Sequence, residues 1–481
     1  MKTLLITAFL LLTFTVFAQK RVAPPAPVLP VPTDAQLAWH DMELNAFIHF
    51  TTNTFTDLEW GLGSESESVF NPSGVHADQW VSVLKKAGFK GVILTCKHHD
   101  GFCLWPSKYT EHSIQNSPYK NGKGDIVKEL SDECKKQDVK FGIYLSPWDR
   151  NRADYGQPSY IEYYRNQLKE LFSTYGPVFE MWFDGANGGS GYYGGANETR
   201  NVDKTKYYDW PKTLDLVRSM EPNIILFSDA GPGVRWCGNE EGCVSATDWN
   251  TITPDTLYAG KAGVENLLGS GSENGTRWIP AESDISIRPG WFYHAKEDSL
   301  VKTPEKLFDI YMKTVGRGSL MLLNVPPDRR GMFHENDVKA LEGFRALLDR
   351  EFKTDLARTA KVKVSSVRGK SKLYGGANLT DNNKETYWTT DDSVTSGIIE
   401  LDLKKAETVK YVVLKEYIKL GQRVKTFNVE VSKNGQWVKV ADETTIGHKR
   451  ILKLDNVTTD KVRVNITGSK ACPVISAIEL Y

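Results

Sequence analysis

Residues 91–100 read GVILTCKHHD, and this stretch decides the fold of the first part of the chain. It is an apolar run of strand length that ends in two histidines and an aspartate. The residues before it, Ala77–Ala87, and after it, Asp125–Lys136, have the pattern of amphipathic helices. Short apolar strands that alternate with helices are typical of a parallel sheet whose two faces are both covered.

The same alternation continues from about residue 35 to residue 352. Further strands are predicted at Ala46–Phe50, Phe141–Ser146, Val178–Asp184, Ile224–Ser228, Trp278–Glu282 and Ser319–Val325, with an eighth near Gly242–Ala246. Further helices are predicted at Ile161–Tyr175, Tyr207–Met220, Pro304–Val315 and Glu335–Arg350. This many strand–helix units predict an α/β fold, a distorted (β/α)8 barrel over residues 35–352. A doubly wound open sheet is the alternative.

After Phe352 the pattern changes to short alternating strands separated by turn residues. No helix of any length is predicted in this part. Residues 353–481 are therefore expected to form an all-β sandwich. The predicted strands are Ile398–Leu403, Val409–Tyr417, Thr426–Ser432, Trp437–Val440, Arg450–Leu454 and Lys461–Ile466.

Composition excludes several classes of protein. The 481 residues include 60 Lys and Arg and 60 Asp and Glu, so the formal net charge is zero. No strong positive field therefore favours a nucleic-acid partner. A share of 40% hydrophobic and 25% charged residues is ordinary for a globular protein, which excludes a disordered or collagen-like chain.

The N-terminus has the pattern of an export signal. Lys2 supplies a positive start, Thr3–Phe17 is an apolar run, and Ala18 is the small residue that precedes cleavage. We expect a signal peptide at residues 1–18, an extended lead-in at residues 19–34, and a periplasmic or secreted mature protein. The alternative is an anchoring first helix, for which the run is short; no later stretch has the ~20 apolar residues of a membrane span.

The six cysteines do not follow a metal-binding pattern. Neither C-x-x-C nor H-E-x-x-H occurs, so the usual zinc motifs are absent. Cys237 and Cys243 bracket a short loop and are the best candidates for a disulfide in an exported chain. Cys96 lies in an apolar strand and is expected to be a buried free thiol.

Polar side chains follow several predicted strands at the point where each strand ends. In a (β/α)8 barrel the active site lies at the C-terminal ends of the strands. Aromatic faces and polar groups gathered there suit a pyranose sugar, which has an apolar C–H face and a ring of hydroxyls. These residues are His49, His98, His99, Asp100, Tyr144, Asp184, Glu240, Glu241, Glu282 and Asp284.

Hydrolysis of a glycoside needs two carboxyl groups, which a retaining enzyme holds ~5–5.5 Å apart. Asp184 ends an apolar strand directly before Gly185. This position would place a carboxylate on a rigid element that faces the barrel mouth. The alternative is a strand-end aspartate that only caps the following helix.

Seven motifs follow one another between residues 47 and 331: FIHF, LEWG, KHHDGFCLWPS, FGIYLSPWD, EMWFDGANG, RWCGNEEG and LLNVPPDRRG. With these motifs, in this order, the sequence resembles the α-L-fucosidases of glycoside hydrolase family 29. The combination of KHHDGF with WFDG is specific. The resemblance implies a distorted (β/α)8 barrel and a retaining double displacement that uses no metal or other cofactor.

The resemblance also implies a role for individual residues. Asp184 in WFDG matches the catalytic nucleophile. Glu240 in GNEEG matches the general acid/base of the branch that looks selective for α-1,3/1,4-linked fucose; Glu241 is the neighbour with which it could be confused. The positions that match the binding site for the fucose hydroxyls and ring are His49, Glu59, Trp60, His98, His99, Tyr144, Trp182 and Trp291.

The second domain contains LTDNNKETYWTT, YVVLKEYIKLGQRVKTFNVEVSKNGQW and SAIELY. These strings resemble a discoidin or coagulation-factor type domain, which corresponds to carbohydrate-binding module family 32 in carbohydrate enzymes. Such modules often carry a structural calcium ion, and Asp381, Thr386 and Glu479 match ligand positions. The domain would either bind sugar or serve as a scaffold that packs on the barrel.

The sequence thus predicts an exported, retaining α-L-fucosidase that releases α-1,3/1,4-linked fucose from branched, Lewis-type oligosaccharides or glycoconjugates. One alternative is a broad α-L-fucosidase that accepts α-1,2 linkages and aryl fucosides. A second is a catalytically silent fucose-binding lectin. The third is a metal-dependent hydrolase in which His49, His98, His99 and Asp184 converge, although neighbouring His98 and His99 point to opposite sides of an extended strand.

Overall fold

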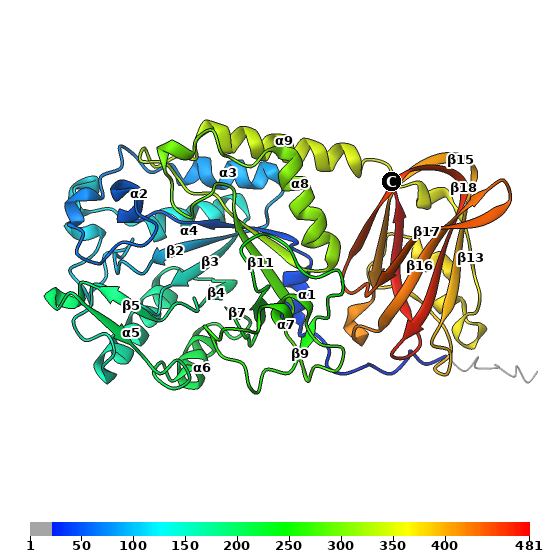
Figure 1. Ribbon diagram of the computed structural model, residues 1–481, viewed down its shortest axis with the longest axis horizontal. Helices are drawn as coiled ribbons and strands as arrows, with labels where there is room; N and C mark the ends of the chain where they lie inside the picture. Colours follow the sequence, from blue (N-terminus) through cyan, green and yellow to red (C-terminus); the bar gives the residue numbers. More distant parts are fainter. Residues whose placement is uncertain (1–21) are drawn as a thin grey trace, which may run out of the picture.

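The computed structural model describes residues 22–481, which form two domains (Figure 1). A barrel of parallel strands makes one half of the molecule, and an antiparallel β-sandwich makes the other. The long helix α9 (Glu335–Glu351) leads from the barrel to the sandwich. The predicted signal peptide lies outside the described residues, and so does the start of the predicted lead-in.

Eight parallel strands close the barrel in the order β1–β12–β11–β8–β7–β4–β3–β2. This arrangement confirms the predicted barrel and excludes the open sheet. The strands are β1 (Leu44–Ile48), β2 (Gly91–Lys97), β3 (Lys140–Leu145), β4 (Glu180–Trp182), β7 (Ile225–Ser228), β8 (Val234–Trp236), β11 (Ala281–Ser286) and β12 (Leu320–Asn324). A small hairpin of β5 (Gly188–Gly191) and β6 (Glu198–Asn201) follows β4.

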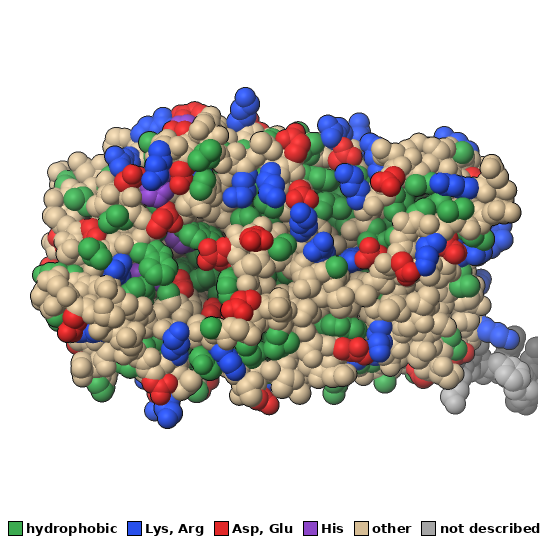
Figure 2. Space-filling model, in the orientation of Figure 1, with side chains coloured by type: hydrophobic (Ala, Val, Ile, Leu, Met, Phe, Trp, Pro, Cys, Tyr) green, Lys and Arg blue, Asp and Glu red, His purple; other side chains and the backbone are tan. Residues whose placement is uncertain are grey.

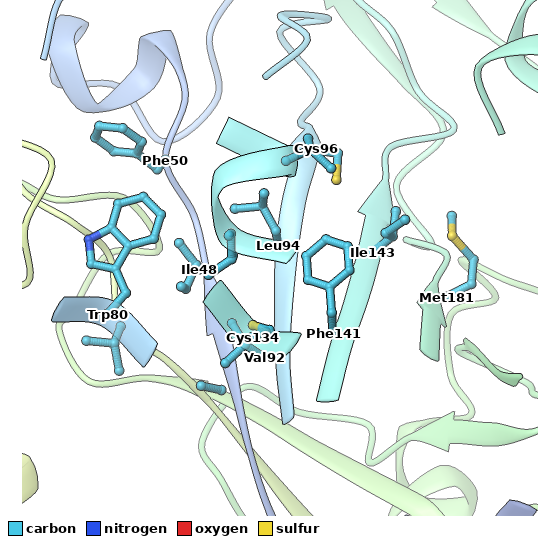
Figure 3. Close-up of a cluster of buried hydrophobic side chains, with 14 of the residues drawn as sticks. Ile48, Phe50, Trp80, Val92, Leu94, Cys96, Cys134, Phe141, Ile143 and Met181 are labelled. Carbon is cyan, nitrogen blue, oxygen red and sulfur yellow. The ribbon is translucent and has the colours of Figure 1, made fainter. Parts of the chain in front are cut away.

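Helices surround the barrel and bury one apolar face against it. In α3 (Ala77–Ala87), Trp80 packs edge-on against Phe50, with ring centroids 5.7 Å apart, and Figure 3 shows this contact within the buried layer. No helix in residues 22–481 combines the length and apolarity of a membrane span. The remaining helices are α1 (Asp34–His40), α2 (Thr52–Thr56), α4 (Ile126–Gln137), α5 (Pro158–Thr174), α6 (Trp210–Met220), α7 (Glu265–Ser270) and α8 (Pro304–Lys313).

Two strand predictions were wrong. The eighth strand is Val234–Trp236 and not Gly242–Ala246, where Gly242 has a φ of +70° and forms part of a turn. The strand expected at Trp278–Glu282 is divided into β10 (Arg277–Trp278) and β11, since Pro280 between them has no N–H for a ladder. β10 pairs with β9 (Thr251–Ile252) outside the barrel.

The sandwich is built from antiparallel strands in the order β14–β19–β15–β18–β16–β17, with β13 beside β15. Two pairs of predicted short strands are each one long strand, because β-bulges bend β15 without ending its ladder with β18. The strands are β13 (Lys361–Val364), β14 (Trp388–Thr389), β15 (Gly397–Glu416), β16 (Val424–Lys433), β17 (Gln436–Thr444), β18 (Arg450–Ser469) and β19 (Val474–Leu480).

The segment before α1 links the two domains. The Val28 N–H donates to the Leu420 carbonyl of the sandwich at 2.9 Å. The chain then enters α1, where the Gln36 side chain donates to the carbonyls of Gly233 and Trp278 at 2.7 and 2.8 Å. Because Gly233 directly precedes β8, α1 closes the N-terminal end of the barrel.

Two buried carboxyl groups, Glu180 of β4 and Glu282 of β11, lie within hydrogen-bond reach of each other inside the barrel. One oxygen of each accepts from an indole: Glu180 from Trp39 at 3.3 Å, and Glu282 from Trp182 at 3.0 Å. The other oxygen of each has no other partner among the described residues. Burial raises the pKa of both groups, and the charge of Glu282 raises that of Glu180 further. One proton shared between the two carboxyls satisfies both remaining oxygens.

A carboxyl group whose pKa is raised by folding stabilises the fold at low pH, and this contribution is lost as the pH rises through the folded pKa. In Glu180→Gln the amide donates to Glu282 permanently. We therefore expect the variant to gain stability relative to the wild type between about pH 5 and pH 8, by up to about 1.4 kcal/mol per pH unit. Urea unfolding at a series of pH values measures this difference.

The control is Glu342→Gln on the exposed face of α9, which should follow the wild type at every pH. A constant difference between Glu180→Gln and the wild type across this range would show that the two carboxyls do not share a titrating proton.

Candidate active site

A cavity of about 240 Å³, a size suited to one sugar ring, opens at the C-terminal ends of the barrel strands. Figure 2 shows histidine side chains within a hollow of the barrel half, with hydrophobic and acidic side chains around them. All the barrel-site residues predicted from the family resemblance line this cavity, except Glu59. The lining residues are Phe47, His49, Trp60, His98, His99, Tyr144, Trp182, Asp184, Gly185, Ala186, Asp229, Trp236, Glu240, Asp284 and Trp291.

Asp184 lies just after β4 and faces the cavity, with 22% of its side chain exposed. Its Oδ2 accepts from the Tyr144 hydroxyl at 2.8 Å, and its Oδ1 accepts from the Ala186 N–H at 2.7 Å. Burial raises the pKa of this carboxyl, while the two hydrogen bonds oppose the rise. The arrangement holds a carboxylate in one orientation beside a sugar-sized space.

The histidines in the cavity wall are neutral. Burial lowers the pKa of His49 and of His99 to about 3, and it also lowers that of His98. His49 Nδ1 lies 2.9 Å from Oδ1 of Asn324, an oxygen that can only accept, so this ring nitrogen carries the proton. Its Nε2 is then a hydrogen-bond acceptor, which suits a sugar hydroxyl.

His99 has the same tautomer for a similar reason. Its Nδ1 lies 2.7 Å from Ser146 Oγ, and that hydroxyl already donates to the Trp148 carbonyl at 2.6 Å. The imidazole must therefore donate, and its Nε2, 3.6 Å from Asp184 Oδ2, stays an acceptor. A ligand hydroxyl between these two groups could donate to either of them.

Aromatic side chains form the walls of the cavity. Trp182 stacks on Phe227, with ring centroids 4.0 Å apart. The Trp182 indole N–H donates to Glu282, which lies deeper in the barrel. Trp60 is 52% exposed at the rim and contacts His99 edge-on. Flat apolar faces of this kind pack against the C–H face of a sugar.

Glu240 reaches the cavity from the β8–β9 loop (residues 237–250), where it is exposed, and its Oε2 accepts from the Trp291 indole at 3.1 Å. Partial burial raises the pKa of this carboxyl, the hydrogen bond from Trp291 opposes the rise, and the negative charges of Asp184 and Glu59 add to it. A raised pKa favours the protonated form that an acid catalyst needs. Glu241 is exposed and does not line the cavity.

Glu59 does not line the cavity. Its carboxylate accepts from the backbone N–H groups of Trp291 and Phe292 at 2.8 and 3.3 Å, and it pairs with His294 at 2.6 Å. The structure thus places Glu59 behind Trp291, where it fixes the backbone that carries this aromatic wall.

Two further carboxyl groups line the cavity. Asp229, which sequence reasoning missed, follows β7, and burial raises its pKa to about 6. Its place directly after a strand was the signal that could have found it. Asp284, predicted at a strand end but given no role, accepts from the Trp236 indole at 2.8 Å, and burial raises its pKa. Glu282, predicted beside it, points into the barrel interior instead.

The loop cysteines do not form the expected disulfide. Cys237 and Cys243 are free thiols. The Cys237 thiol lies 3.1 Å from the Asn239 carbonyl oxygen, and the Cys243 thiol lies 3.6 Å from the Asn239 side-chain oxygen. Asn239 also donates to the Cys243 carbonyl at 3.0 Å. This side chain therefore closes the turn that the disulfide was expected to close. Cys96 is a buried free thiol, as predicted.

Two of the three predicted calcium ligands contact each other, and the third pairs with a lysine. Asp381 and Thr386 contact each other at 2.7 Å, whereas Glu479 pairs with the ammonium of Lys415 at 2.6 Å and accepts from Tyr481 at 2.9 Å. A lysine ammonium at this carboxylate does not fit a shared calcium site. In residues 22–481, no three histidine, cysteine, aspartate or glutamate side chains are grouped so that they could hold a metal ion.

Comparison with known proteins finds a family match for each of the two domains. A model of the α-L-fucosidase family matches residues 28–351, and a model of the F5/8 type C domain matches residues 361–480. Alpha-L-fucosidase 1 of Arabidopsis thaliana is 39% identical over 462 residues, which are 95% of this chain and 88% of the plant protein.

Solved structures extend the similarity. A glycoside hydrolase 29 family member from an unknown rumen bacterium is 43% identical, with a TM-score of 0.85 over 95% of this chain and 78% of that one. A Ruminococcus gnavus GH29 fucosidase in complex with fucose is 35% identical, with a TM-score of 0.85 over 96% and 97%. The chain therefore belongs to the α-L-fucosidases of glycoside hydrolase family 29 and carries a C-terminal F5/8 type C domain.

Proposed function

We propose that this α-L-fucosidase is a retaining enzyme in which Asp184 is the nucleophile and Glu240 is the acid/base. One observation carries the proposal: the two carboxyl groups line the same sugar-sized cavity, from the end of β4 and from the β8–β9 loop. Their surroundings differ in the way that the two roles require. Asp184 accepts two hydrogen bonds that favour its charged form. Glu240 accepts one, from Trp291, and the negative charges of Asp184 and Glu59 near it favour its protonated form.

In the first step Asp184 attacks the anomeric carbon of fucose, and the bond to the leaving oxygen breaks. Glu240 gives its proton to that oxygen, so the leaving sugar departs as a neutral alcohol. Before the reaction Asp184 is charged and Glu240 is protonated, so the two carboxyl groups do not repel each other. The product of this step is a fucosyl ester on Asp184 and a deprotonated Glu240.

In the second step Glu240 accepts a proton from a water molecule, which attacks the anomeric carbon and releases Asp184. Two inversions give overall retention of configuration. His49 and His99 offer neutral ring acceptors to the fucose hydroxyls throughout, and Tyr144 keeps Asp184 in line with the anomeric carbon. Trp182 and Trp291 provide the aromatic walls.

We further propose selectivity for α-1,3/1,4-linked fucose on branched glycans. The GNEEG motif around Glu240 supports it, through its match to the selective branch of the family. The cavity holds one sugar ring, so the rest of a branched glycan would lie at the rim, where Trp60 is exposed beside the opening. Selectivity would then arise from contacts outside the fucose cavity.

Exchange of each proposed catalytic carboxyl tests the mechanism. Asp184→Ala should lower kcat by at least about 10³-fold on every substrate, because no group replaces the attacking oxygen. Glu240→Ala should lose about 10²–10⁴-fold on oligosaccharides and regain turnover of an activated aryl fucoside when azide is added. NMR identifies α-fucosyl azide as the product.

The matched control is Glu241→Ala, which should keep nearly full activity because its side chain lies outside the cavity. Full activity of Asp184→Ala, or azide rescue of Glu241→Ala in place of Glu240→Ala, would contradict these assignments.

A panel of defined oligosaccharides tests the linkage. We expect kcat/KM for a Lewis-type trisaccharide to exceed that for a linear 2′-fucosylated trisaccharide by at least about 10-fold, a difference of about 1.4 kcal/mol. NMR should detect the α-anomer of fucose first. Equal rates would indicate a broad fucosidase, and binding without release of fucose would indicate a lectin.

We also propose that the protein is exported to the periplasm or secreted, on the basis of residues 1–18. N-terminal sequencing of the protein from its native host should begin at Gln19. A sequence that begins at Met1 would contradict cleavage of a signal peptide.

A further inference from the structure

Glu240 lies on a short turn of the β8–β9 loop. The turn begins and ends at Gly238 and Gly242, which have φ values of +85° and +70°, and the Asn239 side chain closes it. The only hydrogen-bond partner that the Glu240 side chain has among the described residues is the Trp291 indole. The position of Glu240 therefore depends on how the loop backbone is anchored. Next to the turn, Val244 and Ser245 donate to the Lys313 and Gly269 carbonyls of the barrel domain at 3.1 and 3.0 Å.

The second half of this loop is anchored by the second domain. Gln422, which precedes β16, is buried and uses its whole side chain on the loop. Its Oε1 accepts from the backbone N–H and the side-chain amide of Asn250 at 2.9 and 3.0 Å. Its Nε2 donates to the Asp248 carbonyl at 2.9 Å. One side chain thus fixes two loop residues.

Neighbouring residues of the sandwich reinforce this contact. The buried Thr445 hydroxyl accepts from the Asp248 N–H at 3.1 Å, and Thr444 and Thr247 share a hydrogen bond of 2.7 Å. Arg450 donates to the Ala246 carbonyl at 2.6 Å. The loop backbone from residue 246 to residue 250 is therefore held by partners from the second domain.

The barrel holds the same segment from the opposite side. The guanidinium of Arg235 in β8 is fully buried and donates to Asp248 Oδ1 at 2.9 Å and to the Trp249 carbonyl at 3.1 Å. Residues 246–250 therefore form hydrogen bonds with β8 on one side and with the sandwich on the other. Removal of the hydrogen bonds on one side would leave buried backbone groups of the loop without partners and allow the loop to shift.

We propose that the second domain positions the acid/base: Gln422 and Thr445 fix the β8–β9 loop so that Glu240 reaches the leaving oxygen. This proposal rests on the proposed role of Glu240. Both are positioning residues, since they act through the loop and do not line the cavity. A displacement of about 1 Å in a reacting group can cost about 10²-fold in rate, so the anchoring of this loop has catalytic consequences.

The test compares leaving groups in Gln422→Leu, which keeps the size of the side chain but removes its three hydrogen bonds. A leaving sugar needs protonation, whereas an acidic phenol such as 2-chloro-4-nitrophenol leaves without it. We expect kcat/KM to fall by about 10- to 100-fold on a fucosylated oligosaccharide, and by less than about 3-fold on the 2-chloro-4-nitrophenyl fucoside.

Two other variants make the result specific. Lys384→Ala breaks the ion pair of 2.8 Å with Asp41, an exposed contact between the domains that does not involve the loop. It should leave both substrates unaffected. Glu240→Gln should show the same dependence on the leaving group as Gln422→Leu, with a larger loss. If Gln422→Leu does not fold, Thr445→Val removes only the hydrogen bond from Asp248 and should give a smaller selective loss.

The outcomes separate the two proposals. Equal losses on both substrates in Glu240→Gln would overturn the role of Glu240 itself. If Glu240→Gln is selective but folded Gln422→Leu and Thr445→Val lose activity equally on both substrates, or lose none, the positioning role of the second domain is overturned. A selective loss in the sandwich variants and none in Lys384→Ala would support it.

Discussion

The carboxylate of Asp184 is held by the Tyr144 hydroxyl on one oxygen and the Ala186 N–H on the other, and the rest of the site is arranged around it. Tyr144 can reach Asp184 because β3 and β4 are parallel neighbours, with Tyr144 opposite Trp182 in the ladder. The contact therefore requires a closed barrel with this strand order. Burial raises the pKa of this carboxyl, and the two donors oppose that rise because they favour the charged form.

Burial has opposite effects on the other ionisable groups of the cavity. It keeps the imidazoles of His49 and His99 neutral, because the charged form of an imidazole is the one that desolvation disfavours. It raises the pKa of Glu240 and Asp229, because there the charged form is the deprotonated one. The same burial thus keeps the imidazoles neutral as acceptors for hydroxyls and shifts the carboxyl groups toward their protonated forms, while two hydrogen bonds oppose this shift at Asp184.

The support of the cavity extends well beyond its walls. Below it, Glu282 holds the Trp182 indole and contacts Glu180, which in turn accepts from Trp39 of the helix that closes the barrel. Beside it, Glu59 fixes the backbone of Trp291. At the second domain, polar side chains meet the β8–β9 loop in a buried interface. In each case a polar side chain away from the cavity orients a residue of the cavity through hydrogen bonds, which offset part of the cost of burying polar groups.

The barrel, the sandwich and most of the cavity lining could be predicted from the sequence alone. Alternating strands and helices are local patterns, and barrel strands present their final residues at one mouth. His49, His98 and Asp184 could be placed in this way. The sequence could not show that Glu59 accepts a hydrogen bond from the Trp291 backbone or that Lys415 pairs with Glu479. It also could not show that Gln422 forms hydrogen bonds with the β8–β9 loop. These contacts join residues far apart in the chain, and local periodicity carries no information about them. Only the packing of complete domains decides which distant donor meets which acceptor.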